Sequence, residues 1–380
     1  MRIPFNKPAV VGSELTYVGQ AVAGGHASGN GPFTDRAERI LEKAFDARRV
    51  LLTTSCTSAL ELAALLCDLQ PGDEVLVPSY TFVSTANAFV LRGARPVFVD
   101  VRPDTLNIDE RLIEQAITPR TRAIIPVHYG GVACEMDTIM DIANRHGLLV
   151  VEDAAQGVFA SYKGRWLGTI GHLGCYSFHE TKNFSCGEGG ALVVNDPAME
   201  HRAEILREKG TNRSQFLRGQ TDKYTWVDVG SSFLPSDMLA AFLVGQVENM
   251  EKITTRRGEI FHRYAEMLAP LVESNLIRTP VEPPHCATNY HMFYILTADI
   301  EERTALIAQL REAGILAVFH YVPLHSSPYA KSLGLLERNL PVTDELSARL
   351  VRLPMYFDLT DHEVVEVADA VLDFYRTRHA

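Results

Sequence analysis

The sequence lacks the long apolar runs and the basic clusters that would point to a membrane or a nucleic acid. Its longest unbroken apolar run is about eight residues, whereas a membrane-spanning helix needs roughly 20, and we expect no signal peptide because the N-terminus has no apolar core. The 36 lysines and arginines are outnumbered by 47 acidic residues, which gives a net charge of −11. Basic residues gather no further than in pairs, so we expect no nucleic-acid partner and no membrane insertion.

Cysteine is scarce as well. The six cysteines show neither the paired spacing of a metal site nor the framework of a secreted disulfide-rich domain. We therefore expect reduced thiols, no metal and a cytoplasmic protein. Glycine and proline, 26 and 19 of 380 residues, are too few for a collagen-like or low-complexity chain.

What the sequence does contain is an alternation of short apolar runs with helical stretches. The predicted strands are residues 74–77, 96–101, 123–127, 148–151 and 190–194, and the predicted helices between them are residues 58–69, 108–116 and 137–143. Apolar strands joined by helices indicate a mixed, mostly parallel sheet that is covered on both faces. We predict a large α/β domain over residues 1–245.

The pattern changes in the last third of the chain. The predicted elements are a long helix over 260–271, a strand at 291–296, a helix at 300–313, a strand at 316–322 and a last helix from residue 360. Apolar residues at helical spacing predict the long helix, and Thr360 with Glu363 forms a capping-box pattern for the last one. We predict a connecting helix and a small α+β domain over residues 246–380.

Polar residues that follow the apolar runs are candidate site residues, because ligands of open α/β sheets lie at the carboxyl ends of the strands. Asp153 follows the run at 148–151, where it is either a helix cap or a carboxylate that pairs with a buried cation. Residues 53–58 are small and polar and open an apolar helix. Free N–H groups there predict either a phosphate site or an ordinary helix cap.

Lys182 stands apart from the other lysines. It is the only lysine or arginine between Arg165 and Arg202, and a glycine-rich segment at 187–190 follows it. A lysine in a mostly apolar loop is a candidate for a lowered pKa and for nucleophilic amine chemistry. The alternative is a structural ion pair with a neighbouring glutamate, Glu180 or Glu188.

Together, the three features match the requirements of pyridoxal 5′-phosphate. The lysine would bind this cofactor covalently, the carboxylate would keep its pyridine nitrogen protonated, and the helix terminus would hold its phosphate. The sequence contains neither a GxGxxG nor a GxxxxGK[ST] element, which disfavours a dinucleotide or a nucleotide P-loop site.

The chain resembles the DegT/DnrJ/EryC1/StrS family of sugar aminotransferases along almost its whole length. The matching segments are residues 54–60, 78–87, 93–101, 126–130, 152–156, 177–183, 187–190 and 320–325. The resemblance implies fold type I of the pyridoxal-phosphate enzymes, with pyridoxamine phosphate as an intermediate. It also implies a homodimer, because the family's cofactor site lies between two subunits.

The resemblance further assigns roles to the residues around the cofactor ring. Lys182 is implied to form a Schiff base with the cofactor and to carry the transferred proton. Asp153 is implied to pair with the pyridinium nitrogen and Gln156 with the ring hydroxyl. Phe82 is implied to stack on the ring, although a core aromatic is its alternative.

The phosphate contacts are implied in the same way. Thr57 and Ser58 would donate their backbone N–H groups, and Ser177 its hydroxyl. Residues 230–232 read Gly-Ser-Ser where most of the family has Gly-x-Asn-Tyr-Arg. Ser232 is therefore a partial substitute for an asparagine that reaches the cofactor phosphate across the dimer interface.

Residues 179–183, 207–216 and 223–226 resemble the members that convert dTDP-4-dehydro-6-deoxy-D-glucose into dTDP-4-amino-4,6-dideoxy-D-galactose. These members use L-glutamate as amino donor and serve cell-surface polysaccharides such as enterobacterial common antigen. We expect His320 and His325 near the sugar, with structural histidines as the alternative. Arg213 and Arg218 are candidates for the nucleotide, with solvated arginines as the alternative.

Three other functions compete with this one. A 3-keto sugar aminotransferase of the same family would share every cofactor contact. A non-catalytic regulator on the same fold would have lost Lys182 or Asp153, and both are present. A sugar dehydratase of the family would carry histidine in place of the lysine.

Overall fold

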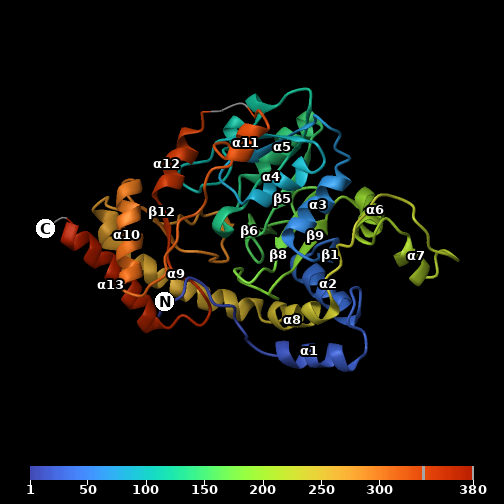
Figure 1. Ribbon diagram of the computed structural model, residues 1–380, viewed down its shortest axis with the longest axis horizontal. Coiled ribbons are helices and arrows are strands. Elements are labelled where there is room, and N and C mark those ends of the chain that lie inside the picture. The colour runs from blue at the N-terminus through green and yellow to red at the C-terminus, as the bar shows by residue number, and fades with distance from the viewer. Residues whose placement is uncertain (336–338, 379–380) are drawn as a thin grey trace.

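The computed structural model describes residues 1–335 and 339–378, which fold around one seven-stranded sheet (Figure 1). In spatial order the strands are β1 (Arg49–Thr53), β9 (Gly190–Val194), β8 (Leu173–Ser177), β5 (Leu149–Asp153), β4 (Thr121–Ile124), β2 (Glu74–Pro78) and β3 (Arg95–Val99). All neighbours from β8 to β3 are parallel, and β9 is antiparallel to both β8 and β1. The predicted mixed, mostly parallel sheet is thus confirmed.

Helices cover both faces of this sheet, as Figure 1 shows. One face carries α3 (Cys56–Leu66), α4 (Val83–Val90) and α6 (Pro197–Arg207), and the other carries α2 (Pro32–Phe45), α5 (Met136–His146) and α8 (Asp237–Val247). Successive strand residues point to opposite faces. In β1, Val50 and Leu52 therefore join one core and Leu51 joins the other.

The C-terminal part forms a separate hydrophobic core. The elements that contribute to it are α9 (Met250–Glu273), β11 (Tyr294–Leu296), α10 (Ile300–Glu312), β12 (Leu350–Arg352) and α13 (Asp361–Arg378). The other two C-terminal helices, α11 (Pro328–Ser332) and α12 (Pro341–Arg349), contribute Ala330 and Leu346 to other clusters. The N-terminal residues belong to this core too, because Arg2 and Ile3 donate their N–H groups to the Gly314 carbonyl. No described helix is both long and apolar enough to cross a membrane.

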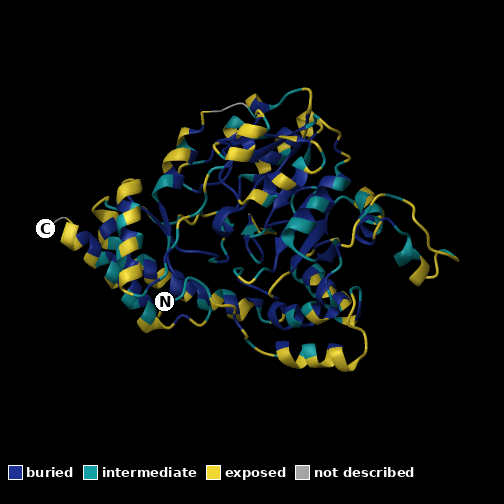
Figure 2. Ribbon diagram, viewed as in Figure 1, coloured by how far each residue is buried: buried dark blue, intermediate teal, exposed yellow. Residues whose placement is uncertain are grey.

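The remaining elements are short or peripheral. They are α1 (Glu14–Ala23), α7 (Arg213–Leu217), the strands β6 (Ser161–Tyr162), β7 (Arg165–Trp166) and β10 (Cys286–Ala287), and the 3₁₀ helices η1 (Glu110–Leu112), η2 (Glu114–Ala116) and η3 (Tyr129–Gly131). Residues 211–229, which include α7, form an arm that projects from the body of the molecule (Figure 1). Much of this arm is exposed (Figure 2).

Two predicted elements have a different secondary structure from the one expected. The predicted helix at 108–116 consists of the two 3₁₀ turns η1 and η2, because the Asp109 carboxylate accepts the Arg111 N–H and competes with a regular helix. The predicted strand at 316–322 makes only an isolated bridge from Val318 to Arg352. The predicted capping box of α13 is confirmed, since Thr360 and Glu363 exchange hydrogen bonds at 2.8 and 3.2 Å.

Candidate active site

A cavity of about 350 Å³ lies at the carboxyl ends of the central strands. Asp153 ends β5 and Ser177 ends β8, while Thr57 and Phe82 belong to the segments that follow β1 and β2. Of the predicted site residues, the cavity is lined by Thr57, Phe82, Asp153, Gln156, Ser177, Lys182 and His320. Residues from distant parts of the sequence are therefore brought to one place.

Lys182 lies in the wall of this cavity at the end of a short turn, where its N–H is donated to the His179 carbonyl. Burial lowers the pKa of its ammonium group to about 8, because the charged form loses hydration. The structural alternative is not observed: no ion pair of Lys182 with Glu180 or Glu188 occurs in the described part of the chain. Glu188 lies 3.6 Å from His179 instead.

Asp153 is 4% exposed and holds two short hydrogen bonds. The Thr85 hydroxyl donates to one carboxylate oxygen at 2.7 Å, and the Ala155 N–H donates to the other at 3.1 Å. Burial nevertheless raises the pKa of this carboxyl group. Within residues 1–335 and 339–378 it forms no ion pair, so a cation placed in the cavity would find a buried carboxylate ready to pair with it.

The first turn of α3 lies where the sequence predicts a phosphate cradle. Ser55 caps the helix by accepting the Ser58 N–H at 3.0 Å, whereas the N–H groups of Cys56 and Thr57 have no acceptor within a helix. Both residues line the cavity. A Cβ atom on Gly190 would lie 2.4 Å from the Cys56 nitrogen, so only glycine lets β9 pack this closely against the cradle.

Phe82 and Gln156 face the cavity from different segments. Phe82 is 54% exposed, so it is not the core aromatic of the alternative interpretation, and its ring lies 6.2 Å from that of Tyr321. The Gln156 carbonyl oxygen accepts the Gly130 N–H at 2.7 Å, and its amide donates to the Tyr321 hydroxyl at 3.2 Å. His320 lies 2.9 Å from the Tyr129 hydroxyl.

Three residues predicted to contact the cofactor or the sugar lie outside the lining of the cavity. Ser58 points its hydroxyl at Thr54 and Ser55 and its N–H is already bonded. His325 is buried against the Ser79 hydroxyl at 2.7 Å, which favours its structural alternative. Ser232 is exposed in the loop after the arm, so any contact with the cofactor would come from a second subunit.

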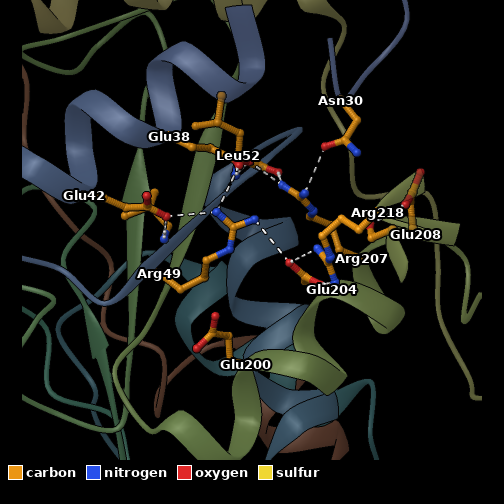
Figure 3. A network of polar contacts seen from close by, with 12 residues as sticks. Asn30, Glu38, Glu42, Arg49, Leu52, Glu200, Glu204, Arg207, Glu208 and Arg218 are labelled. Carbon is orange, nitrogen blue, oxygen red and sulfur yellow. Dashed lines mark hydrogen bonds and ion pairs between the residues drawn. The ribbon is translucent and has the colours of Figure 1, made fainter. Parts of the chain in front are cut away.

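The two candidate arginines of the arm are ion-paired. Arg213 donates to the buried Glu208 at 2.7 Å. Arg218 donates to both oxygens of Glu204, at 3.1 and 2.7 Å, beside a network that also contains Arg49 (Figure 3). Neither arginine lines the cavity, so within one chain both hold the base of the arm.

The structure adds lining residues that we did not single out from the sequence, namely Thr85, His291, Tyr321 and Arg352. His291 Nδ1 lies 2.9 Å from the side-chain amide oxygen of Asn183 and thereby fixes the residue next to Lys182. One signal was available for Arg352, because it is the only charged residue in the apolar run 350–355.

The family model of the DegT/DnrJ/EryC1/StrS aminotransferases matches residues 9–372. The chain belongs to this family. It is 34% identical over 383 residues to the spore coat polysaccharide biosynthesis protein SpsC of Bacillus subtilis, covering 98% of this chain and 97% of that protein.

Solved structures agree with this membership. The putative sugar aminotransferase Spr1654 of Streptococcus pneumoniae superimposes with a TM-score of 0.92 at 27% identity, over 99% of this chain and 98% of that one. It has also been solved in forms named for pyridoxal and pyridoxamine phosphate. The aminotransferase TlmJ of Streptoalloteichus hindustanus gives 0.91 at 30% identity over 100% of both chains. The predicted fold type, aminotransferase class and cofactor are confirmed at the level of the family.

The cavity of this chain fits pyridoxal 5′-phosphate on its own evidence. The cradle at Cys56 and Thr57 offers unpaired N–H groups to a phosphate. The unpaired Asp153 carboxylate suits a protonated pyridine nitrogen, and Lys182 supplies an amine of lowered pKa. When bound, this cofactor supplies an electron sink for carbon–hydrogen bond cleavage.

Proposed function

We propose that this protein transfers the amino group of L-glutamate to carbon 4 of dTDP-4-dehydro-6-deoxy-D-glucose. The product would be dTDP-4-amino-4,6-dideoxy-D-galactose, a precursor of cell-surface polysaccharide such as enterobacterial common antigen. The observation that carries the proposal is the meeting of Lys182, Asp153 and the α3 cradle in one cavity. The relation to a polysaccharide biosynthesis protein supports a sugar as the acceptor.

Each residue would have a defined task in this reaction. Asp153 would hold the proton on the ring nitrogen, and the N–H groups of Cys56 and Thr57 would bind the phosphate. Phe82, at the mouth, would cover one face of the ring. Lys182, released from the cofactor when an amine replaces it, would move the proton at the reacting substrate carbon.

We further propose that the working unit is a cytoplasmic homodimer. The arm carries a group of exposed apolar side chains: Phe216, Leu217, Tyr224, Trp226, Val227 and Val229. Contiguous apolar exposure of this kind is typical of an interaction surface. A second copy of the chain would cover it and could bring Ser232 to the partner's cavity.

An end-point assay tests the substrate. The enzyme is incubated with L-glutamate and dTDP-4-dehydro-6-deoxyglucose, and the product is identified by NMR, with Lys182→Ala as the inactive control. An amine at carbon 4 in the galacto configuration is expected. Amination only of a 3-keto sugar would identify the competing enzyme of the same family, and no amination by wild type of either sugar would favour the regulator.

A further inference from the structure

Arg352 is a cation of the cavity wall whose side chain has no partner for its charge. It ends β12 and lines the same cavity as Lys182. No hydrogen bond or ion pair of its guanidinium occurs among the described residues, and its Nε atom is buried without a partner. Its only described contact is stacking on Phe5, with 4.6 Å between the guanidinium carbon and the ring centre.

Two other buried arginines have a structural role in this protein, and in both the guanidinium is hydrogen-bonded to protein groups. Arg257 donates to three backbone carbonyls, those of Tyr290, His291 and Met355. Arg207 pairs with Glu38 at 2.5 Å. An unpaired buried charge is costly, so the absence of such partners at Arg352 indicates that its partner is a ligand.

The neighbours of Arg352 do not supply a negative charge. The tyrosines Tyr80, Tyr129 and Tyr321 surround it, and burial raises the pKa of each phenol, so they stay neutral. His291 and His320 are also near, and burial lowers the pKa of both, so they add no charge. Lys182 lines the same cavity and carries no negative charge in either protonation state. This part of the cavity therefore selects an anion.

Three anions belong to the proposed reaction, and two are poorly placed for this site. The cofactor phosphate would bind instead at the free N–H groups of the first turn of α3. The sugar diphosphate is attached to carbon 1, across the ring from the carbon that must reach Lys182. In an amino acid, by contrast, the carboxylate is separated from the transferred nitrogen by one carbon atom.

We propose that Arg352 binds the carboxylate next to the transferred amino group of the amino donor. Its planar guanidinium matches a carboxylate with two parallel hydrogen bonds, and that contact holds the donor's amine close to Lys182. Phe5 stacks on the guanidinium and so limits the positions that it can take. The inference rests on the proposed aminotransferase function and names the recognition element for its first substrate.

The test separates the two half-reactions of the holoenzyme. In Arg352→Gln the KM for L-glutamate should rise about 100-fold, the scale of losing a charged bidentate contact. The half-reaction with the dTDP sugar should stay within threefold of wild type, and Arg352→Lys should recover part of the loss. Arg376→Gln, an exposed arginine paired with Asp373, removes the same charge from the surface as control.

A second readout does not depend on turnover. Glutarate has the two carboxylates of the donor but no amine, so calorimetry on the holoenzyme measures its binding alone. Binding should be lost in Arg352→Gln and kept in Arg376→Gln. The melting temperature of Arg352→Gln should not fall, because the substitution removes an uncompensated buried charge.

The opposite results overturn the proposal. Unchanged glutarate binding, an equal loss in both half-reactions or a lowered melting temperature would assign Arg352 to the fold or the cofactor. A loss confined to the sugar half-reaction would assign it to the diphosphate. If wild type accepts glutamate but rejects the dTDP sugar, the proposed function fails while the role of Arg352 stands.

Discussion

Lys182 and Asp153 lie in the same cavity, and burial shifts their pKa values toward each other. The Lys182 ammonium group is lowered to about 8 and the Asp153 carboxyl group is raised. In both residues the cause is the lost hydration of the charged form. Pyridoxal 5′-phosphate needs both groups: a free amine that reacts with its aldehyde, and a carboxylate that pairs with its protonated ring nitrogen.

The pKa of Lys182 sets the pH dependence of cofactor capture by the apoenzyme. Only the neutral amine is nucleophilic, and with a pKa of about 8 roughly a tenth of it is neutral at pH 7. The rate of covalent binding of pyridoxal 5′-phosphate should therefore rise about tenfold per pH unit below 8 and level off above it. Stopped-flow absorbance from pH 6 to 10 measures this rate.

The matched control for this measurement is pyridoxamine phosphate, which cannot form the bond to Lys182 and should bind without that pH profile. Borohydride reduction followed by peptide mapping should find the cofactor on Lys182. A midpoint near 10.5, the ordinary lysine value, would contradict the burial argument.

Asp153→Asn should lower the transamination rate by at least ~100-fold, the scale of losing a placed electrostatic partner in a dry site. The amide cannot stabilise a protonated ring nitrogen. Thr85→Val, which removes only the hydroxyl bonded to Asp153, should have a smaller effect. Single-turnover rates measure both, and melting curves check that the variants fold. Near-normal turnover of Asp153→Asn would refute the pairing.

Sequence reasoning found Lys182 and Asp153 because each is unusual among its sequence neighbours. It did not single out Tyr321 and Arg352, which line the cavity although they lie more than a hundred positions after Lys182 in the sequence. It also assigned the Ser58 N–H to a phosphate, whereas Ser55 already caps it. Competition between neighbouring side chains for one donor is decided by rotamers, which the sequence does not specify.

At the scale of elements, one buried ion pair joins α2 to α6 under the arm (Figure 3). Glu38 accepts from Arg207 at 2.5 Å and from the Leu52 N–H of β1 at 3.0 Å. Both side chains are almost fully buried. The pair therefore connects two helices and the edge strand of the sheet.

Glu38→Ala should destabilise the protein by about 3–5 kcal/mol, because it leaves the buried Arg207 charge without a charged partner. The double variant Glu38→Gln/Arg207→Met should recover most of this loss, since no charge then stays buried. Urea denaturation measures the free energy of unfolding. If the single and double variants lose equal free energy of unfolding, the loss comes from packing and not from the unpaired charge.

The strands of the central sheet were predictable where they are continuously apolar, as in β2 and β9. We did not predict β8 (Leu173–Ser177), because glycine, cysteine and serine make up three of its five residues. Its strand state comes from neighbours on both sides, β5 and β9. Tertiary pairing overrides local preference there.

At the scale of the whole molecule, the arm predicts self-association. Trp226 is 78% exposed in the single chain, and burying it between two copies would stabilise a dimer. Trp226→Asp should shift the protein toward monomer in sedimentation experiments. Ile300→Asp, an equally apolar exposed site on α10 at the far end of the molecule, should not.

Fluorescence gives an independent check, because the chain has only two tryptophans. In Trp166→Phe the emission comes from Trp226 alone. Its maximum should move to shorter wavelength as the protein concentration rises through the dimerisation range. An emission maximum that stays at the position of a solvated indole would argue against an interface at the arm.

The N-terminal segment has a consequence for how the protein is made. Ile3 bridges Ile315 and Phe5 stacks on Arg352, so these residues find their places only among residues that are synthesised much later. The sheet with its cradle, Asp153 and Lys182 is synthesised before those places exist. A nascent chain therefore holds Lys182 and Asp153 before Arg352 completes the wall of the cavity, and a product truncated before β12 would expose Lys182 without Arg352.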